Sequence, residues 1–244
     1  MITNPTTGTN VHEIAAGIFR INTPVPPSVV PGGFTFNQFL IVDQQPLLFH
    51  TGPRRMFPLV REAVAAVLGD VSRLRHVAFS HVEADECGSL NDWLRAAPDA
   101  QPVCSTIAAT VSVADLADRA PRALADGEEL VLGSHQLRWL DAPHVPHNWE
   151  CGYLFETTTR TLLCGDLFTH AGAAELPALT TQEVLGPSEA ARHELGGVAI
   201  EIGTRAILEK LASTEPLTLA LMHGSSYQGD GRALLLGLAD ALEA

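Results

Sequence analysis

The stretch Ser80-His81-Val82-Glu83-Ala84-Asp85-Glu86-Cys87-Gly88 decides how this chain is interpreted. It follows the run Leu74 to Phe79, whose Leu, Val and Phe side chains are typical of a buried strand. It precedes Ser89 to Ala97, where apolar residues recur at helical spacing. Four side chains that can bind a metal therefore crowd a strand-to-helix turn, where open α/β sheets usually present their chemistry. The alternative is a solvated acidic loop at a helix N-terminus, where the helix dipole favours Asp and Glu.

The length and composition allow a large folded core. Of the 244 residues, 46% are hydrophobic, and we expect one domain that spans residues 1–244. Lys and Arg number 15 against 28 Asp and Glu, and the net charge of −13 repels phosphate backbones and anionic membranes. We therefore expect no nucleic-acid partner and no membrane partner. Met1 to Asn10 lacks a signal-peptide pattern and no run of roughly 18 apolar residues occurs, so we expect a cytoplasmic protein.

The four cysteines stand singly, without a C-x-x-C pair, in a chain that is large enough to fold without disulfides. We interpret them as reduced thiols, mostly in the core: Cys87, Cys104, Cys151 and Cys164.

Apolar and turn patterns predict strands and helices along the whole chain. Strands are expected at 11–22, 34–42, 46–50, 74–79, 102–105, 129–132, 136–140, 151–156, 161–164 and 217–221, and helices at 56–68, 89–97, 106–113, 198–212 and 232–242. Residues 171–194 contain Gly and Pro and are predicted to form a loop that covers the cleft.

Four of the predicted strands end in a side chain that can bind a metal. These ends carry His81 with its acidic neighbours, His144, Asp166 and His223. One such residue is usually structural, but four in one chain favour a shared metal site.

Other polar residues lie near these strand ends. His147, His170 and Tyr227 each lie within a few residues of a candidate ligand, and they are candidates to orient a ligand or a bound oxygen species. The remaining histidines lie in or beside ordinary elements and are interpreted as structural: His12, His50, His76, His135 and His193.

The order H-x-E-x-D, PHVPHN, LLCGDLF and MHGSSY resembles the metallo-β-lactamase superfamily, whose hydrolases typically show H-x-H-x-D-H followed by a His, an Asp and a His. Glu83 stands where the hydrolases carry histidine, and it is the mark of the flavodiiron branch and its flavin-free relatives, the oxygen-binding diiron proteins. The segment GGFTFNQFLIVDQQPLLFHTG also resembles the flavodiiron N-terminal hairpin. The resemblance implies an αββα sandwich of the α+β class, in which two mixed sheets pack face to face with helices outside and a dinuclear metal centre at one edge.

The resemblance also implies a ligand set for two iron ions. One iron would take His81, Glu83 and His144, the second would take Asp85, Glu86 and His223, and Asp166 would bridge them. His144 is preferred to His147 because PHVP matches the His-x-Pro segment of the family. Position 86 is Glu where the family usually has His, and an extra carboxylate there should lower the reduction potential.

The residue types favour iron independently of the resemblance. Hydrolytic zinc sites favour His and Cys, whereas four carboxylates with three His form an oxygen-rich set that suits iron or manganese. The hypothesis is that the site binds O2, NO or peroxide and reduces it. No FMN is expected in this chain, because the flavodoxin domain that carries FMN in flavodiiron proteins is not seen in the sequence. Electrons would then come from a separate donor protein.

Two other functions stay open on the sequence alone. The first is a zinc hydrolase, in which a metal-bound hydroxide attacks a thioester, lactone or phosphoester. The second is a sensor of oxygen or redox state that binds its ligand without turnover. The sequence leaves open the electron donor and the oligomeric state, monomer or homodimer.

Overall fold

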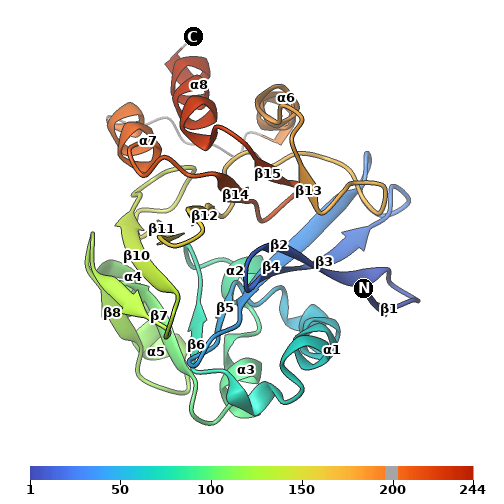
Figure 1. The fold of residues 1–244 in the computed structure, drawn as a ribbon, viewed down its shortest axis with the longest axis vertical. Coiled ribbons are helices and arrows are strands. Elements are labelled where there is room, and N and C mark those ends of the chain that lie inside the picture. The colour runs from blue at the N-terminus through green and yellow to red at the C-terminus, as the bar shows by residue number, and fades with distance from the viewer. Residues whose placement is uncertain (196–202, 244) are drawn as a thin grey trace.

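The computed structural model describes residues 1–195 and 203–243, and it arranges them in layers (Figure 1). Two β-sheets pack face to face. The helices α1 (Phe57–Leu68) and α3 (Leu90–Ala96) cover the outer face of one sheet, and α7 (Thr204–Ala212) and α8 (Gly231–Glu243) cover the outer face of the other. The predicted αββα sandwich of two mixed sheets is confirmed.

The first sheet contains eight strands in the order of the chain. They are β1 (Ile2–Asn4), β2 (Thr9–Ala15), β3 (Ile18–Val25), β4 (Phe34–Ile41), β5 (Leu47–Phe49), β6 (His76–Ala78), β7 (Gln101–Ser105) and β8 (Arg122–Leu124). Neighbours are antiparallel from β1 to β5 and parallel from β5 to β8. The strand predicted at 11–22, with a turn or bulge suggested by Gly17, is divided into the hairpin of β2 and β3, because the chain reverses at Gly17 with a φ of 71°.

The second sheet contains seven strands in the order β13-β15-β14-β12-β11-β10-β9. They are β9 (Glu129–Val131), β10 (Gln136–Asp141), β11 (Gly152–Glu156), β12 (Thr161–Leu163), β13 (Leu179–Thr180), β14 (Thr218–Ala220) and β15 (Ser226–Gln228). β12 and β14 are parallel neighbours. Their carboxyl ends therefore reach the same edge of the sheet.

The remaining helices are short, apart from α6. They are η1 (Arg54–Met56), η2 (Val71–Arg73), α2 (Ala84–Cys87), α4 (Thr106–Ala108), the π-helical turn η3 (Ala109–Val113), α5 (Ala114–Leu116) and α6 (Leu185–Leu195). The predicted loop 171–194 thus contains β13 and most of α6. The helix predicted at 198–212 corresponds to α7, and its first part, 198–202, lies outside the described residues.

The core lies in the three interfaces between the layers. Along β4, Leu40 packs toward α1 and α3, whereas its neighbours Phe39 and Ile41 pack between the two sheets. This alternation follows from the twofold periodicity of a strand, and burial on both sides explains why residues 39–41 of β4 are all apolar. The third interface joins the second sheet to α7 and α8 through residues such as Leu219 and Leu235. Each fully buried side chain of this kind contributes about 1.5–3 kcal/mol.

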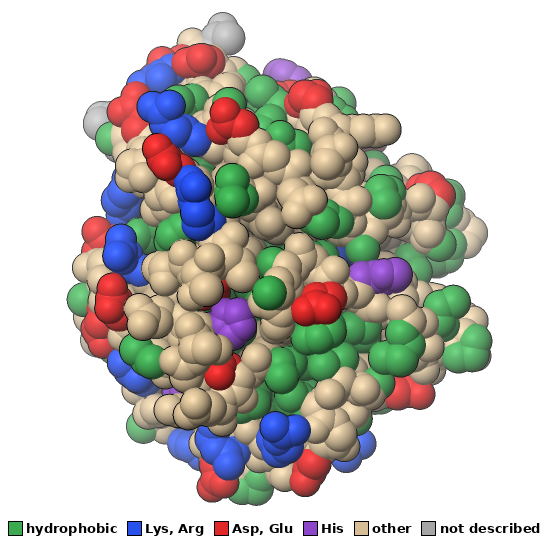
Figure 2. All heavy atoms as spheres, in the orientation of Figure 1, with side chains coloured by type: hydrophobic (Ala, Val, Ile, Leu, Met, Phe, Trp, Pro, Cys, Tyr) green, Lys and Arg blue, Asp and Glu red, His purple; other side chains and the backbone are tan. Residues whose placement is uncertain are grey.

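The surface carries charges of both signs. On the face drawn in Figure 2, basic and acidic side chains are interspersed and do not gather into one basic patch. Arg205, for example, contacts Asp240 at 2.6 Å and Glu243 at 2.7 Å. Among the described residues, no helix is long and apolar enough to cross a membrane.

Candidate metal centre

The acidic turn lies at the end of β6, an interior strand between β5 and β7. His81 follows this strand and is fully buried. Glu83 directly precedes α2 but makes no capping hydrogen bond with its side chain, so its carboxylate serves another contact. The buried carboxylate of Glu150 accepts a hydrogen bond from the N–H of Val82 at 3.0 Å, and this contact fixes the turn against the second sheet.

The other polar side chains of the site come from the second sheet. Asp166 follows β12 and His223 follows β14, and these strands are parallel neighbours. His147 lies in the loop between β10 and β11. The site therefore forms where the ends of strands from both sheets meet, and this brings together His81, Asp166 and His223, three of the candidate ligands at predicted strand ends.

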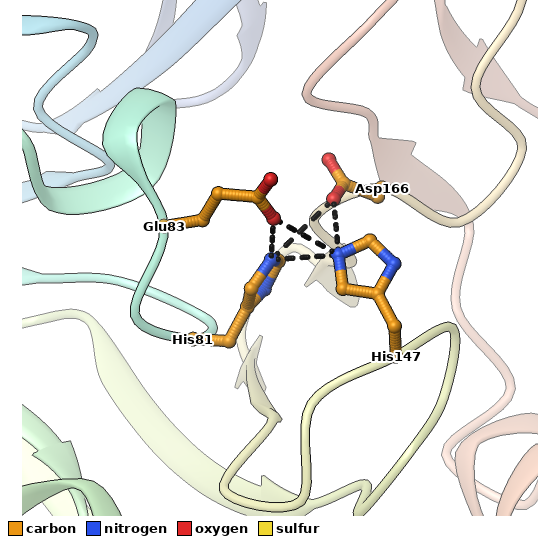
Figure 3. A group of neighbouring side chains, drawn as sticks. All are labelled: His81, Glu83, His147 and Asp166. Atoms are coloured by element: carbon orange, nitrogen blue, oxygen red, sulfur yellow. Dashed lines mark hydrogen bonds and ion pairs between the residues drawn. The ribbon is translucent and has the colours of Figure 1, made fainter. Parts of the chain in front are cut away.

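A first group of ligand atoms comes from His81, Glu83, His147 and Asp166 (Figure 3). The Nε2 atoms of His81 and His147 are 3.0 Å apart, and each lies 3.1 Å from Oε2 of Glu83. Oδ2 of Asp166 lies 3.4 Å from Nε2 of His147 and 3.6 Å from Nε2 of His81. Spacings of this size are those expected between atoms that share one ion at bond lengths of about 2.0–2.2 Å.

A second group comes from Asp85, Glu86 and His223. Nε2 of His223 lies 3.3 Å from Oδ2 of Asp85 and 3.4 Å from Oδ1 of Asp166. Both carboxylate oxygens of Glu86 are buried, and within residues 1–195 and 203–243 neither has a hydrogen-bond partner. A buried carboxylate without partners is strongly disfavoured unless a cation binds it, so this residue fits a metal ligand.

The charges of the site shift several pKa values. Burial, and then the negative charges of Asp166 and Asp85, raise the pKa of Glu86 well above its usual value. Burial raises the pKa of Asp166, but its hydrogen bond and charge interaction with His223 outweigh this effect, and the net pKa is lowered. Burial lowers the pKa of His223, but the carboxylates of Asp166 and Asp85 raise it to about 9 overall. The protein alone thus balances its carboxylates with protons, which a metal cation can replace.

His144 is not part of either group, which differs from the prediction based on the PHVP match. Its side chain is exposed, whereas His147 on the other side of Val145-Pro146 turns into the site. The loop closes through a hydrogen bond from the N–H of His144 to the carbonyl of Asn148, at 2.8 Å. The hydroxyl of Tyr153 also donates to the carbonyl of Val145 at 2.5 Å. These contacts hold the loop with His147, and not His144, toward the other candidate ligands.

Residues of the first sheet contact His223 on the side of the ring opposite the candidate ligands. Its Nδ1 lies 2.7 Å from the carbonyl oxygen of Thr35, and the N–H of Gly224 donates to Oγ1 of the same threonine at 2.6 Å. The side chains of Asn37 and Arg20 donate to the carbonyl of Gly224 at 2.9 and 3.0 Å. None of these polar residues was singled out from the sequence, because their partners lie between 187 and 204 residues away in the chain.

His170 supports the same segment. Its Nε2 accepts a hydrogen bond from the N–H of Ser225 at 3.0 Å, and its Nδ1 lies 2.9 Å from the carbonyl of Phe168. His170 therefore acts on His223 through the backbone. Tyr227, in contrast, packs against the core between the second sheet and its helices, and it does not line the cavity above the ligands.

Burial raises the pKa of the Cys87 thiol to about 11, so this thiol stays protonated at neutral pH.

His50 was interpreted as structural from the sequence, but the structure connects it to a candidate ligand. Its Nε2 lies 3.0 Å from Oγ of Ser80, which lies 2.9 Å from Nδ1 of His81. A signal for this role was present in the sequence, because His50 lies at the end of the predicted strand 46–50, and the candidate ligands also lie near strand ends.

A cavity of about 250 Å³ opens above the ligand groups. Its floor includes Glu83, Asp85, His147, Asp166 and His223. Most of its wall is apolar and comes from Phe34, Phe36, Val145, Leu167, Phe168, Leu195, Leu238 and Leu242, while Arg192 and Glu189 of α6 add an ion pair. The ring of Phe34 lies against His223 with a centroid distance of 4.3 Å.

Comparisons with solved structures place this fold in a known class. The rubredoxin oxygen:oxidoreductase of the anaerobe Desulfovibrio gigas matches 96% of this chain with a TM-score of 0.81 and 16% identity, and the match covers 62% of that protein. A 1–254 fragment of a putative diflavin flavoprotein from a Nostoc species matches with a TM-score of 0.82 and 19% identity over 96% of this chain and 95% of the fragment. The flavodiiron core from a Synechocystis species gives a TM-score of 0.78 and 20% identity over 96% of this chain and 61% of that one. The chain thus spans about three fifths of the D. gigas and Synechocystis chains.

These likenesses define the class: a metallo-β-lactamase-like fold of the kind found in flavodiiron cores. The family model described as ODP family beta lactamase matches residues 34–188, and the chain belongs to this family. The family prediction made from the sequence is confirmed. No curated protein sequence matches the chain significantly.

Proposed function

We propose that this protein is a non-haem diiron protein that binds and reduces O2 with electrons from a separate redox partner. The observation that carries this proposal is the position of Asp166. Its Oδ2 faces His147 at 3.4 Å, and its Oδ1 faces His223 at 3.4 Å, so one carboxylate lies between the two ligand groups. A carboxylate in this position is suited to bind two metal ions at once.

The donor set favours iron over zinc. Four carboxylates and three imidazoles surround the two positions: Glu83, Asp85, Glu86 and Asp166 with His81, His147 and His223. Oxygen-rich sets suit iron and manganese, whereas zinc sites favour nitrogen and sulfur ligands. When bound, ferrous iron would pass electrons to O2, and the separate redox partner would return the iron to the ferrous state. The protein residues would hold the ions, and Glu86 would release its proton when a metal binds.

The cavity supports a small apolar substrate. O2 and NO carry no charge, so they enter an apolar cavity without a large desolvation penalty. Phe34 and Phe36 surround His223, with ring centroids 4.3 and 5.4 Å from the imidazole. The two rings cover His223, which is only 5% exposed.

The first ligand group is accessible to an electron donor. The side chain of Glu83 is 50% exposed and that of His147 is 29% exposed. Trp149, two residues beyond His147, is 53% exposed. A partner protein that docks at this edge would approach the candidate ligands without a change in the fold.

The size of the cavity favours a second candidate, a metal-dependent hydrolase. A volume of about 250 Å³ is larger than a diatomic molecule needs, and Arg192 can face a polar group of an organic substrate. In such an enzyme the metal would supply a hydroxide nucleophile.

The test begins with protein expressed with iron and purified without oxygen. We expect bound iron, and we expect the ferrous protein to consume O2 when the two are mixed in a closed oxygen electrode cell. The zinc-loaded protein is the matched control and should consume none. Preference for zinc, together with hydrolysis of simple aryl esters, would instead support the hydrolase. Iron that binds O2 once, without sustained consumption when a reductant regenerates the ferrous form, would indicate a sensor.

A further inference from the structure

His81 and His223 are the two buried histidines of the site. In each of them Nε2 faces the other candidate ligands, and Nδ1 has a different hydrogen-bond partner in the two residues. Nδ1 of His223 faces the carbonyl oxygen of Thr35 at 2.7 Å. A carbonyl only accepts hydrogen bonds, so this contact places a proton on Nδ1, and the neutral ring then presents the Nε2 lone pair to the site. Nδ1 of His81 instead faces the hydroxyl of Ser80 at 2.9 Å. A hydroxyl donates as well as accepts, so Ser80 alone does not determine where His81 carries its proton.

The hydroxyl of Ser80 has a second neighbour. Nε2 of His50 lies 3.0 Å from it, and Nδ1 of His50 lies 3.0 Å from the sulfur of Met222. Ser80 is 1% exposed, and His50, His81 and Met222 are fully buried. The ring of His50 also stacks on Phe49 with a centroid distance of 4.2 Å, which fixes its plane. Water therefore does not compete for these contacts.

The sulfur of Met222 determines which atom donates and which accepts in each hydrogen bond from His50 through Ser80 to His81. A thioether has lone pairs but no proton, so it bonds to His50 only when Nδ1 of His50 carries the hydrogen. Burial lowers the pKa of His50 to about 3, so its ring is neutral and has one N–H. Nε2 of His50 must then accept the hydrogen of Ser80. The oxygen of Ser80 is left to accept from Nδ1 of His81.

We infer that Met222 acts as a positioning residue that selects, through His50 and Ser80, the metal-binding tautomer of His81. With its proton on Nδ1, His81 presents the Nε2 lone pair toward Glu83 and His147. If each donor and acceptor were exchanged, Nε2 of His81 would carry the hydrogen, and this hydrogen would block metal binding. This inference rests on the proposed metal site. It does not depend on which metal binds or on the reaction that follows.

Nitrogen-15 NMR tests the direction, because long-range proton–nitrogen correlation spectra distinguish the two tautomers of a neutral histidine. The His50 signals are assigned as those lost in His50→Asn. We expect His50 to carry its proton on Nδ1 in the metal-free and the zinc-loaded protein. Finding the proton on Nε2 would overturn the inference, and this measurement on the unsubstituted protein requires no stable variant.

Two substitutions then test the order of the contacts. Met222→Leu keeps the apolar volume and removes the acceptor, so His50 should shift toward the other tautomer. Zinc affinity, measured by competition with a chromophoric chelator, should fall by about tenfold. Ser80→Ala should lower zinc affinity similarly and leave the tautomer of His50 unchanged. The matched control is Met56→Leu, at a partly buried methionine that packs near α1, and it should change neither quantity.

The inference is wrong if Met222→Leu leaves both the His50 tautomer and the zinc affinity unchanged. The inference is also wrong if Ser80→Ala changes the tautomer of His50 and Met222→Leu does not. A protein that passes these tests but consumes no O2 with iron would disprove the proposed reaction only. A protein that consumes O2 while His50 carries its proton on Nε2 would disprove this inference only.

Discussion

The Nε2 atoms of His81 and His147 lie 3.0 Å apart, with the two rings at 89° to each other. Two imidazole nitrogens at this distance repel each other when both present lone pairs, so the arrangement requires a proton or a metal ion between them. Oε2 of Glu83 lies 3.1 Å from both nitrogens. These three atoms converge on one position, and only one of them belongs to the loop between β10 and β11.

Replacement of His147 should therefore weaken the first metal position. In His147→Gln the ring nitrogen is lost, and we expect the metal affinity of that position to fall by at least about tenfold. Equilibrium dialysis against zinc or ferrous iron measures the change. His144→Gln is the matched control, because its exposed side chain lies outside both groups. Equal losses in the two variants would mean that the loop rearranges when metal binds.

This pair of histidines shows where prediction from the sequence succeeds and where it ends. His81, Asp166 and His223 follow buried strands, and strand ends gather at one edge of a sheet, so a shared site was predictable. The choice between His147 and His144 was not predictable. It depends on the hydrogen bonds that close the loop, and those involve Asn148 and Tyr153.

The fold shows the same limit. The hairpin of β4 and β5 was predictable from its dense apolar and β-branched residues. The helix α6 was not predicted, because Gly186 and Pro187 suggested a loop, although proline is tolerated in the first turn of a helix. The contact between His50 and Met222 joins residues 172 positions apart, and no local pattern predicts it.

Glu86 should give the metal-free protein a characteristic pH dependence. Its pKa in the fold is raised above 4.5, first by burial and then by the charges of Asp166 and Asp85. The folded state therefore keeps a proton that the unfolded state releases, so the stability from this residue is present at low pH. That stability is lost as the pH rises above about 4.5 toward the folded pKa.

The variant Glu86→Gln removes this titration. We expect the free energy of unfolding of the variant, relative to the unsubstituted protein, to increase as the pH rises above about 4.5. Urea denaturation in the presence of a chelator measures this difference. A difference that stays constant with pH would show that Glu86 is ionised in the metal-free fold.

Gly224 should be sensitive to the smallest substitution. Its φ is 96°, and a Cβ atom at this position would overlap the ring of His170. Gly224→Ala should therefore combine backbone strain with overpacking and lower the free energy of unfolding by about 2–4 kcal/mol. Because the next residue toward the N-terminus is His223, metal affinity at the second group should fall as well.

Gly127→Ala provides the control for Gly224→Ala. Gly127 has a φ of 79°, but a Cβ atom there meets nothing within 4 Å. Only backbone strain contributes at this position, so Gly127→Ala should lower the free energy of unfolding by about 1–2 kcal/mol and leave metal affinity unchanged. If the two variants lost the same stability, the contact between Gly224 and His170 would not be a tight one.

The cavity allows a final test that separates the two candidate reactions. Ala191 of α6 lines the cavity, and a Trp at this position would occupy much of its volume of about 250 Å³. A diatomic molecule needs little space, so Ala191→Trp should slow O2 consumption by the iron-loaded protein by less than about tenfold, a loss worth about 1.4 kcal/mol. An organic ester would no longer fit, so any ester hydrolysis should be lost. The matched control is Ala190→Trp, at an exposed position on the same helix that does not line the cavity. A complete loss of O2 consumption in Ala191→Trp but not in Ala190→Trp would show that O2 must pass through the part of the cavity beside Ala191, and ester hydrolysis that survives in Ala191→Trp would contradict an ester site in this cavity.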